Sequence, residues 1–451
     1  MKKLFHGNES MQLASLNATE LESTISNKFD YMFADLLNDS GNFLPESDET
    51  YQSLKSIGKK MAEAASSEES EIPAAYTYFG QFIDHDISLV GAPGGNEILK
   101  TVFQPFSPEI IKKEFKNVRT GAFDLDSLYA KPARRTKDGV MELGKVSPSS
   151  LPIPTSDKDH DLLRKPLIKD PQSDDDKEND RQALIGDNRN DENLLVAQLH
   201  VAFLRAHNAL IQRDGLSFEE ARTALRRRYQ SAVLNDFLMR ICDPEIMKKL
   251  KYEGASFSLI DQETGKMFMP IEFSSAAYRF GHSMVRESYN HNRNFENSDF
   301  ELLFTFTALS GDLSRSEGAN QENETLPDNW IIEWDRFLPG NNLKNRARKI
   351  DTHVAPEMNN LRNHQGIPLE GIMKQLATRN LLRGYLHRLP TGQAIAKKLE
   401  FEPLQGDLLL NNLPSGLKEA VKKANMQDRT PLWLYVLAEA GMKADNKPTG
   451  E

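Results

Sequence analysis

Helical periodicity in the middle of the chain is the feature that most limits what this sequence can fold into. Apolar residues recur at intervals of three and four over residues 193–212, which indicates a long helix with one face against a core. A second stretch of this kind covers residues 218–241, and Ser217 with Glu220 has the pattern of a capping box at its start. Alternation typical of strands is sparse. The sequence therefore predicts a mainly α fold with very little β structure.

We expect a single large helical domain over residues 71–445, because neither a repeat nor a linker divides the sequence. Residues 1–70 are polar, with acidic and serine-rich runs, and are predicted to form an N-terminal arm that wraps the domain. Residues 170–183 are rich in charged side chains and are predicted to be a surface loop. Periodicity predicts further helices at residues 74–87, 274–285, 371–385, 417–425 and 431–442.

Charge and composition exclude some classes of partner. The formal net charge is −10, which argues against binding to nucleic acid. The one cysteine, Cys242, cannot form an intrachain disulfide. No secretory signal and no membrane span are expected, because no uninterrupted apolar run has the necessary length. A cytoplasmic location is the default expectation, with non-classical export as the alternative, and no obligate protein partner is evident.

The first segment with potential chemistry is residues 80–86. Gln81, Asp84 and His85 are three or four positions apart and share one face of a helix. Asp86 is turned to roughly the opposite side. One face would therefore offer an amide, a carboxylate and an imidazole to a common site. The alternative is a solvated cluster of polar side chains.

The second segment offers oxygen atoms at short intervals. Thr120, Asp124 and Asp126, with backbone carbonyls between them, suit a hard cation such as calcium. Asp86 could complete the ligand set from the back of the first helix. The alternative is an ordinary acidic turn.

The third segment leads into the helix predicted at residues 193–212. Arg189 and Glu192 are three positions apart, so both can face one cavity. The alternative is that Asp191 and Glu192 only interact favourably with the helix dipole.

Two further segments place polar residues in apolar helices. His282 follows Gly281, which leaves room for a bulky group, and Arg279 lies about one turn earlier. Asn380 and Arg383 form a polar pair three positions apart. A histidine satisfied within the core and a buried hydrogen-bonded pair are the alternatives.

Together, the five segments resemble the animal haem peroxidase superfamily, with its myeloperoxidase- and peroxidasin-like members, in their order and separations. The resemblance covers residues 78 to about 393 and continues weakly to residues 430–433. The run at residues 125–129 (Leu-Asp-Ser-Leu-Tyr) is similar to the calcium segment of the bacterial branch. The resemblance implies a haem peroxidase that contains haem b and calcium. Such an enzyme reduces hydrogen peroxide and oxidises small anionic or aromatic donors, here bromide, iodide, thiocyanate or phenols.

The resemblance also implies catalytic roles. His85 would take a proton from peroxide and return it to the leaving oxygen. Arg189 would stabilise the O–O bond as it breaks, and Gln81 would position water or halide. His282 would be the proximal iron ligand, and Asn380 would accept a hydrogen bond from its other ring nitrogen.

The same resemblance implies that several charged residues bind haem or calcium. Asp84 and Glu192 match carboxylates that form ester bonds to haem methyl groups. Arg279 matches an arginine near the haem edge, and Arg383 matches one that pairs with a haem propionate. The implied calcium ligands are Asp86, Thr120, Asp124, Asp126 and the carbonyl of Ala122.

Some positions depart from the pattern of the superfamily. Asn193 stands where the chlorinating branch has methionine, so strong chloride oxidation is not expected. Arg279 stands where fatty-acid dioxygenases have a tyrosine, and Tyr278 is predicted to face ~100° away from that direction. Both observations argue against lipid oxygenation. A fatty-acid dioxygenase of the same superfamily is kept as the first alternative, and a non-catalytic haem-binding protein as the second. Asp126 stands where many members have serine, which adds charge to the cation site. Bacterial members continue into a further helix beyond the position of residue 451.

Overall fold

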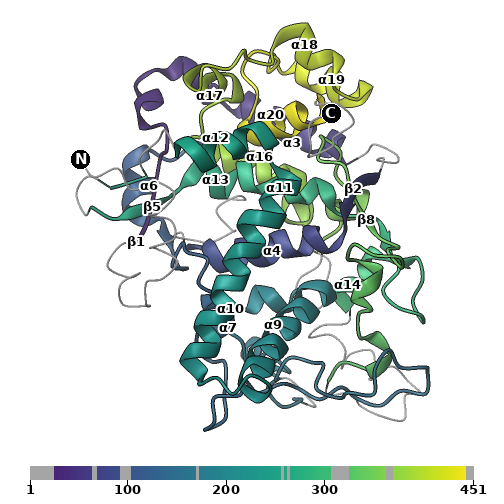
Figure 1. Ribbon diagram of the computed structural model, residues 1–451. Coiled ribbons are helices and arrows are strands. Elements are labelled where there is room, and N and C mark those ends of the chain that lie inside the picture. The colour runs from purple at the N-terminus through teal and green to yellow at the C-terminus, as the bar shows by residue number, and fades with distance from the viewer. Residues whose placement is uncertain are drawn as a thin grey trace.

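The computed structural model describes residues 25–62, 69–91, 103–168, 172–254, 259–261, 265–305, 325–361 and 369–442. Within these residues helices dominate, and the expectation of a mainly α fold is confirmed. A central helix, α4, crosses the middle of the molecule between two groups of helices (Figure 1). The helices concerned are α4 (Ala75–Ile87), with α7 (Asp126–Tyr129) and α9 (Leu194–Gln212) on one side and α13 (Ile271–Ser275), α16 (Leu376–Leu386) and α20 (Leu432–Met442) on the other.

Helix α4 has one face in the apolar core and another that bears polar groups. Phe82 and Ile83 are fully buried. The ring of Phe82 stacks on that of Phe203 in α9, with centroids 4.7 Å apart. Because Phe82 anchors one face of α4, the neighbouring Gln81 and Asp84 are turned toward the interior space described below.

By length and composition, α9 is the one helix in the described residues that could cross a membrane. Its apolar window is 61% buried inside the protein. Its position beside α4 is that of a core helix, for which an apolar composition is ordinary.

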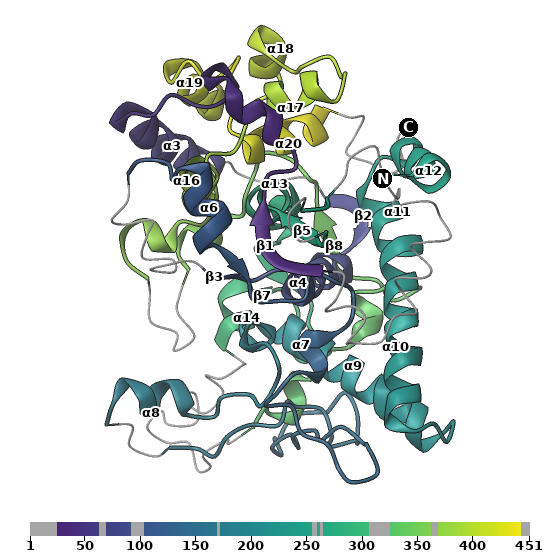
Figure 2. The ribbon, with the colours of Figure 1, turned by 90° about the vertical axis from the view of Figure 1, so that its left-hand side faces the viewer.

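The helix predicted over residues 218–241 is a continuous rod with a change of winding. It consists of α10 (Phe218–Ala232), a π-helical turn (Val233–Phe237) and α11 (Leu238–Ile241). The capping box of Ser217 and Glu220 is confirmed. Figure 2 shows the rod along one edge of the molecule, leading to α12 (Pro244–Glu253).

Residues 25–62 contribute to the common core. Helix α3 (Asp48–Met61) packs against α16, and its Leu54, Ile57 and Met61 are fully buried in the same apolar cluster as Phe82. The amphipathic spacing of these three residues explains why the segment is helical and lies against the domain.

The strands are short. One four-stranded sheet has the order β3-β4-β1-β5, in which β1 is parallel to β5 and antiparallel to β4. Two antiparallel pairs, β2 with β8 and β6 with β7, complete the sheets of the described residues. The bounds are β1 (Ile25–Asp30), β2 (Glu69–Pro73), β3 (Val90–Gly91), β4 (Lys116–Asn117), β5 (Met267–Pro270), β6 (Ser288–Tyr289), β7 (Ser298–Asp299) and β8 (Arg346–Arg348).

Short helices and 3-10 turns fill the remaining structure. The α-helices are α6 (Pro108–Glu114), α8 (Asp174–Asn179), α14 (Phe300–Thr305), α17 (Gly392–Lys398), α18 (Gly406–Asn411) and α19 (Ser415–Lys423). The 3-10 helices are η1 (Ala34–Asn38), η2 (Ser40–Asn42), η4 (Asn188–Asp191), η6 (Ala277–Met284), η7 (Asp328–Trp330), η8 (Trp334–Arg336), η9 (Pro356–Asn359) and η10 (Gly371–Lys374).

Two predicted helices are wound differently from the expectation. The stretch at 274–285 is the end of α13 followed by the 3-10 helix η6, and the stretch at 371–385 begins as η10 before α16. Within 170–183, α8 begins at a capping box of Ser173 with Asp176 and lies at the periphery (Figure 2). Asp180 and Arg181 are buried and form an ion pair of 2.7 Å, so the stretch also has an inward-facing end.

Because α3 approaches α16 closely at Gly58, even a substitution by alanine there is expected to lower stability. A Cβ added at Gly58 would lie 2.6 Å from the Cα of Thr378. Gly58→Ala should therefore lower the free energy of unfolding by about 1–3 kcal/mol, measured by denaturant unfolding. Gly416→Ala in α19 is the control, because the nearest atom there is the flexible Lys60 Cδ at 3.5 Å. An equal loss of stability in both variants would contradict the packing argument.

Candidate active site

The polar face of α4 brings together Gln81, Asp84 and His85, as predicted. His85 is only 4% exposed, whereas Gln81 and Asp84 are partly exposed. The Ser88 hydroxyl donates to Asp84 Oδ1 at 2.7 Å and so holds this carboxylate against the end of the helix.

The His85 ring lies between two groups from the segment that precedes α9. Its Nδ1 is 2.8 Å from Asn190 Oδ1, and its Nε2 is 3.9 Å from Glu192 Oε1. Burial, followed by the positive charge of Arg189, lowers the pKa of His85 to about 4. The imidazole is therefore neutral near neutral pH and can accept a proton.

Arg189 is fixed by the carboxylate of Asp187 and by the end of α4. Its Nε and Nη2 donate to Asp187 at 3.0 and 2.7 Å. Its Nη2 also donates to the carbonyl oxygens of His85 (3.1 Å) and Ser88 (2.8 Å). This arrangement joins η4 to α4 and keeps a positive charge near His85.

Asp187 is a residue that the sequence reasoning missed. It is 3% exposed and forms a second ion pair with Arg119 Nε at 3.0 Å. Burial would raise its pKa, but its hydrogen bonds and ion pair with Arg189 outweigh burial and lower it. Its position as the N-cap of η4, two residues before Arg189, is the signal that could have revealed it.

Glu192 reaches Gln81 across the same space. Gln81 Nε2 donates to Glu192 Oε1, and Asn193 Nδ2 donates to Gln81 Oε1 at 3.1 Å. The side chain of Glu192 is 44% exposed, yet the surrounding protein is close enough that burial raises its pKa to about 7. Its carboxylate therefore borders an open space enclosed by the fold.

The second histidine, His282 in η6, contacts Asn380 of α16, its predicted partner. Asn380 Nδ2 lies 2.7 Å from His282 Nδ1. The ring of Trp433 in α20 packs edge to face with His282, with centroids 6.4 Å apart, and its Nε1 donates to the carbonyl of Arg279. Burial, and then the charges of Arg279, Arg383 and Arg379, lower the pKa of His282 well below its usual value.

Three arginines surround His282. Arg279 Nε donates to the Ser274 carbonyl at 3.0 Å, and Arg379 Nη1 donates to the Met373 carbonyl at 3.2 Å. Burial, followed by the charge of Arg279, lowers the pKa of both Arg379 and Arg383. Arg279 and Arg383 were predicted for the site, whereas Arg379 was not. The three guanidinium groups make this side of the site strongly positive.

The two groups of residues lie close enough to interact electrostatically, and we call the region between them the central space. A Cβ added at Gly281 would meet nothing within 4 Å, so open space lies beside His282 as predicted. Asp84 interacts electrostatically with Arg279 and Arg383, and Glu192 interacts with Arg379. These couplings place the carboxylates of α4 and η4 opposite the arginines of η6 and α16.

Tyr278 lies beside Arg279 in η6, and its side chain contacts α4. Its hydroxyl donates to the carbonyl of Gly80 at 3.2 Å, so the side chain points toward α4. Because η6 is a 3-10 helix, neighbouring residues are turned by about 120° from each other instead of about 100°, so the two side chains point in different directions. Burial and the charge of Asp84 raise the pKa of Tyr278 well above its usual value.

The predicted cation ligands gather behind α4. Carboxylate oxygens of Asp86, Asp124 and Asp126 lie within 4.8 Å of one another. Burial and the other two carboxylates raise the pKa of Asp86, and burial and Asp124 raise that of Asp126 to about 7. Thr120 Oγ1 accepts from the backbone N–H of Ala122 at 3.3 Å and borders the cluster through Asp124. All five predicted residues therefore lie in one region.

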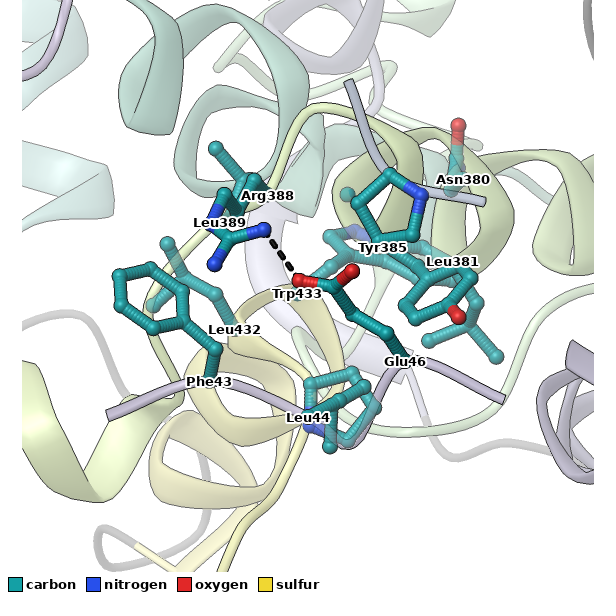
Figure 3. A pocket seen from close by; sticks show the side chains of 13 residues that line it. Phe43, Leu44, Glu46, Asn380, Leu381, Tyr385, Arg388, Leu389, Leu432 and Trp433 are labelled. Atoms are coloured by element: carbon teal, nitrogen blue, oxygen red, sulfur yellow. Dashed lines mark hydrogen bonds and ion pairs between the residues drawn. The ribbon is translucent and has the colours of Figure 1, made fainter. Parts of the chain in front are cut away.

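A separate small pocket lies on the outer side of α16 (Figure 3). Asn380 and Trp433 are among the residues that line it, and two other lining residues, Arg388 and Glu46, form an ion pair. Among the residues predicted for the site, Asn380 is the one that lines this pocket. The pocket is therefore distinct from the central space between His85 and His282.

Comparison with known proteins identifies the family. The sequence profile described as animal haem peroxidase matches residues 99–407, more than half of the chain, and the chain belongs to this family. A peroxidase-like protein of Margaritifera margaritifera is 28% identical over 232 residues, which are 46% of this chain and 26% of that protein. The chain thus matches about a quarter of the length of this curated relative.

Solved structures share the fold. Peroxidase A from Dictyostelium discoideum superposes with a TM-score of 0.59 and 17% identity, covering 95% of this chain and 85% of that chain. The fatty acid alpha-dioxygenase of Oryza sativa gives a TM-score of 0.53 and 13% identity, covering 99% and 82%. At these identities the similarity shows the fold and leaves the reaction to be argued from the site.

Because Asp187 pairs with Arg119 and Arg189, its substitution is expected to lower stability strongly. Asp187→Asn leaves two arginines without their shared carboxylate, and should lower the free energy of unfolding by roughly 3 kcal/mol. Asp214→Asn is the control, because its pair with Arg213 lies at the surface and should be of little consequence. Denaturant unfolding of both variants tests this, and equal stability of the two would refute the role of Asp187.

Proposed function

We propose that this protein is a haem-dependent peroxidase that reduces hydrogen peroxide and oxidises small donors such as bromide, iodide, thiocyanate or phenols. The observation that carries the proposal is the placement of two histidines at one central space. His85, with Arg189, lies on one side of it, and His282, with Asn380, lies on the other. On the strength of the run at residues 125–129, we assign the chain to the bacterial branch of the superfamily.

The residues around the central space fit haem b. Three partly buried arginines act on His282, and burial followed by the charge of Arg279 lowers the pKa of the other two, so this side favours an anionic group such as the two haem propionates. The open space beside Gly281 leaves room for a flat, bulky group. When bound there, haem would supply the two-electron redox chemistry of peroxide reduction. In this proposal His282 binds the iron, Arg279 lies at the haem edge and Arg383 pairs with a propionate.

Binding of iron sets the orientation of the Asn380 amide. A histidine that binds metal through Nε2 carries its proton on Nδ1, so its partner must be an acceptor. Asn380 now presents Nδ2 to His282 Nδ1. We therefore expect the amide to turn by about 180° in the haem-bound protein, so that Oδ1 accepts from Nδ1.

The opposite residues supply acid–base and electrostatic catalysis. His85 is neutral, faces the central space and can take a proton from peroxide before returning it to the leaving oxygen. Arg189 is held by Asp187 and keeps a fixed positive charge close to the breaking O–O bond. Gln81, fixed by Glu192 and Asn193, positions water or halide.

Two carboxylates are candidates for covalent attachment. Asp84 and Glu192 both border the central space, from α4 and from the residue after η4. We propose that they form the ester bonds to haem. Each ester bond would form between a carboxylate oxygen and a haem methyl carbon that loses one proton and two electrons, and the hydrogen peroxide that the enzyme reduces would be the oxidant.

The geometry favours peroxide chemistry over oxygenation of a fatty acid. Arg279 occupies the position where dioxygenases have a tyrosine. The hydroxyl of the adjacent Tyr278 is held by the Gly80 carbonyl. Asn193, which stands where the chlorinating branch has methionine, donates a hydrogen bond to Gln81 and so belongs to the hydrogen-bond network of the site.

We also propose a calcium ion bound by Asp86, Thr120, Asp124, Asp126 and the carbonyl of Ala122. Three largely buried carboxylates have oxygens within 4.8 Å of one another. Burial raises the pKa of all three, and repulsion by neighbouring carboxylates raises that of Asp86 and Asp126 further. A divalent cation with oxygen ligands would remove this repulsion. Because Asp86 is next to His85 in α4, the ion would brace the catalytic helix from behind.

The proposed function predicts the effect of removing His85. His85→Ala should lower the rate of peroxide turnover by at least about 10²-fold, because no base remains to take the proton. Haem binding, followed by Soret absorbance, should persist because His282 is unchanged. His160→Ala is the matched control, as its ring lies near the surface beside Asp157. Undiminished turnover in His85→Ala would refute the mechanism.

The proposed calcium site predicts that removal of the cation lowers the stability of the protein. An ion bound only by the folded state adds about 2.7 kcal/mol at 100 times its Kd. A chelator should therefore lower the Tm of the calcium-loaded protein. The Asp126→Asn variant should respond less, since it has lost one ligand. An unchanged Tm of the calcium-loaded wild type after chelation would count against the site.

A further inference from the structure

Asn190 lies buried between two histidines. Its Oδ1 is 2.8 Å from Nδ1 of His85, and its Nδ2 is 3.1 Å from Nδ1 of His200 in α9. Asn190 and His200 are both 0% exposed. Neither residue was identified from the sequence, and the proposed mechanism does not yet use them.

The chemistry of the amide restricts the protons on both rings. An amide oxygen only accepts hydrogen bonds and an amide nitrogen only donates them. Because Oδ1 faces His85, the proton of this neutral imidazole lies on Nδ1. Its Nε2 then carries a lone pair on the side of Glu192, whose Oε1 is 3.9 Å away. This is the form of histidine that can take a proton from a molecule in the central space.

We infer, resting on the proposed function, that Asn190 is a positioning residue that keeps His85 in the tautomer able to accept a proton, and that the contact with His200 holds the Asn190 side chain beside His85. The Asn190 side chain does not touch the substrate in this proposal. It acts through His85.

His200 can hold the amide because it stays neutral. Burial lowers its pKa to about 3, so the ring is neutral and one of its two nitrogens has a lone pair. With Asn190 Nδ2 at 3.1 Å as donor, the lone pair is on Nδ1 and the proton is on Nε2, which is buried without a hydrogen-bond partner in the described residues. A turned amide would require the protons of both histidines to change position together. The His200 ring is also held by Phe82, whose ring centroid lies 6.1 Å away in an edge-to-face contact.

The backbone of Asn190 is fixed on both sides. Its own N–H donates to the Asp187 carbonyl at 3.0 Å. The next residue, Asp191, accepts from both Nη atoms of Arg164, at 2.6 and 2.9 Å. The preceding residue, Arg189, is bound to Asp187 and to α4. The amide therefore has little freedom to move away from His85.

Cyanide binding to the haem-loaded protein tests this inference without turnover. Hydrogen cyanide gives up its proton when cyanide binds ferric haem, so its binding rate reports on a neutral base nearby. Asn190→Leu should slow cyanide binding at pH 7 by at least about 10²-fold, because nothing then fixes the tautomer. Asn190→Asp keeps an acceptor for His85 Nδ1 and should stay within about tenfold of the wild type.

Two further variants separate positioning from stability. Asn208→Leu is the matched control: Asn208 is also buried and forms two hydrogen bonds with the backbone of Met141, but it lies away from His85. It should lower Tm and leave the cyanide rate unchanged. His200→Leu should give a rate between those of the wild type and Asn190→Leu.

The outcomes distinguish this inference from the proposed function. If the wild type shows Soret absorbance and binds cyanide, but Asn190→Leu binds it equally fast, the positioning role is refuted and the peroxidase proposal stands. Asn190→Asp as slow as Asn190→Leu would also refute it, since a purely structural role predicts damage from a buried charge. A wild type that binds no haem would refute the proposed function itself.

Discussion

Asp187 pairs with two partly buried arginines, Arg119 and Arg189, and Arg189 also binds the end of α4. The catalytic half of the centre depends on this arrangement. Charges taken out of water must be paired, and here one carboxylate satisfies both cations. The half that contains His282 differs, because Arg279, Arg379 and Arg383 act on one another and on the histidine. On one side of the central space a carboxylate thus pairs with the arginines, and on the other the cluster of arginines favours an anionic ligand.

Helix α4 links the two charged regions of the protein. Its inner face carries His85 and Asp84, its core face carries Phe82, and Asp86 reaches the acidic cluster behind it. A shift of α4 would move all of them together. This coupling explains how a cation on one face can influence a histidine on another, because a helix packed against α9 moves as a rigid body.

Local patterns accounted for much of the site. Spacing placed Gln81, Asp84 and His85 on one face, and the pairing of His282 with Asn380 followed from a resemblance spread over five segments. Other residues could not be found this way. Asn190 and His200 are ten positions apart in the chain, and only the junction of η4 and α9 brings the His200 ring to the Asn190 amide. The hydrogen bond from Tyr278 to the Gly80 carbonyl was not predicted either, because it joins η6 to α4 and depends on how the two helices pack.

The amino-acid sequence by itself determined the helical class, the long helices at 194–212 and 218–241 and the identities of the residues that can carry the chemistry, because periodicity and side-chain chemistry are local properties. Tertiary structure alone decided which charges are paired and which are not, where the open space beside Gly281 lies, and which nitrogen of His85 faces it. These features depend on contacts between residues about a hundred positions apart, such as Asn190 with His85 and Asn380 with His282, and no local pattern encodes such distances.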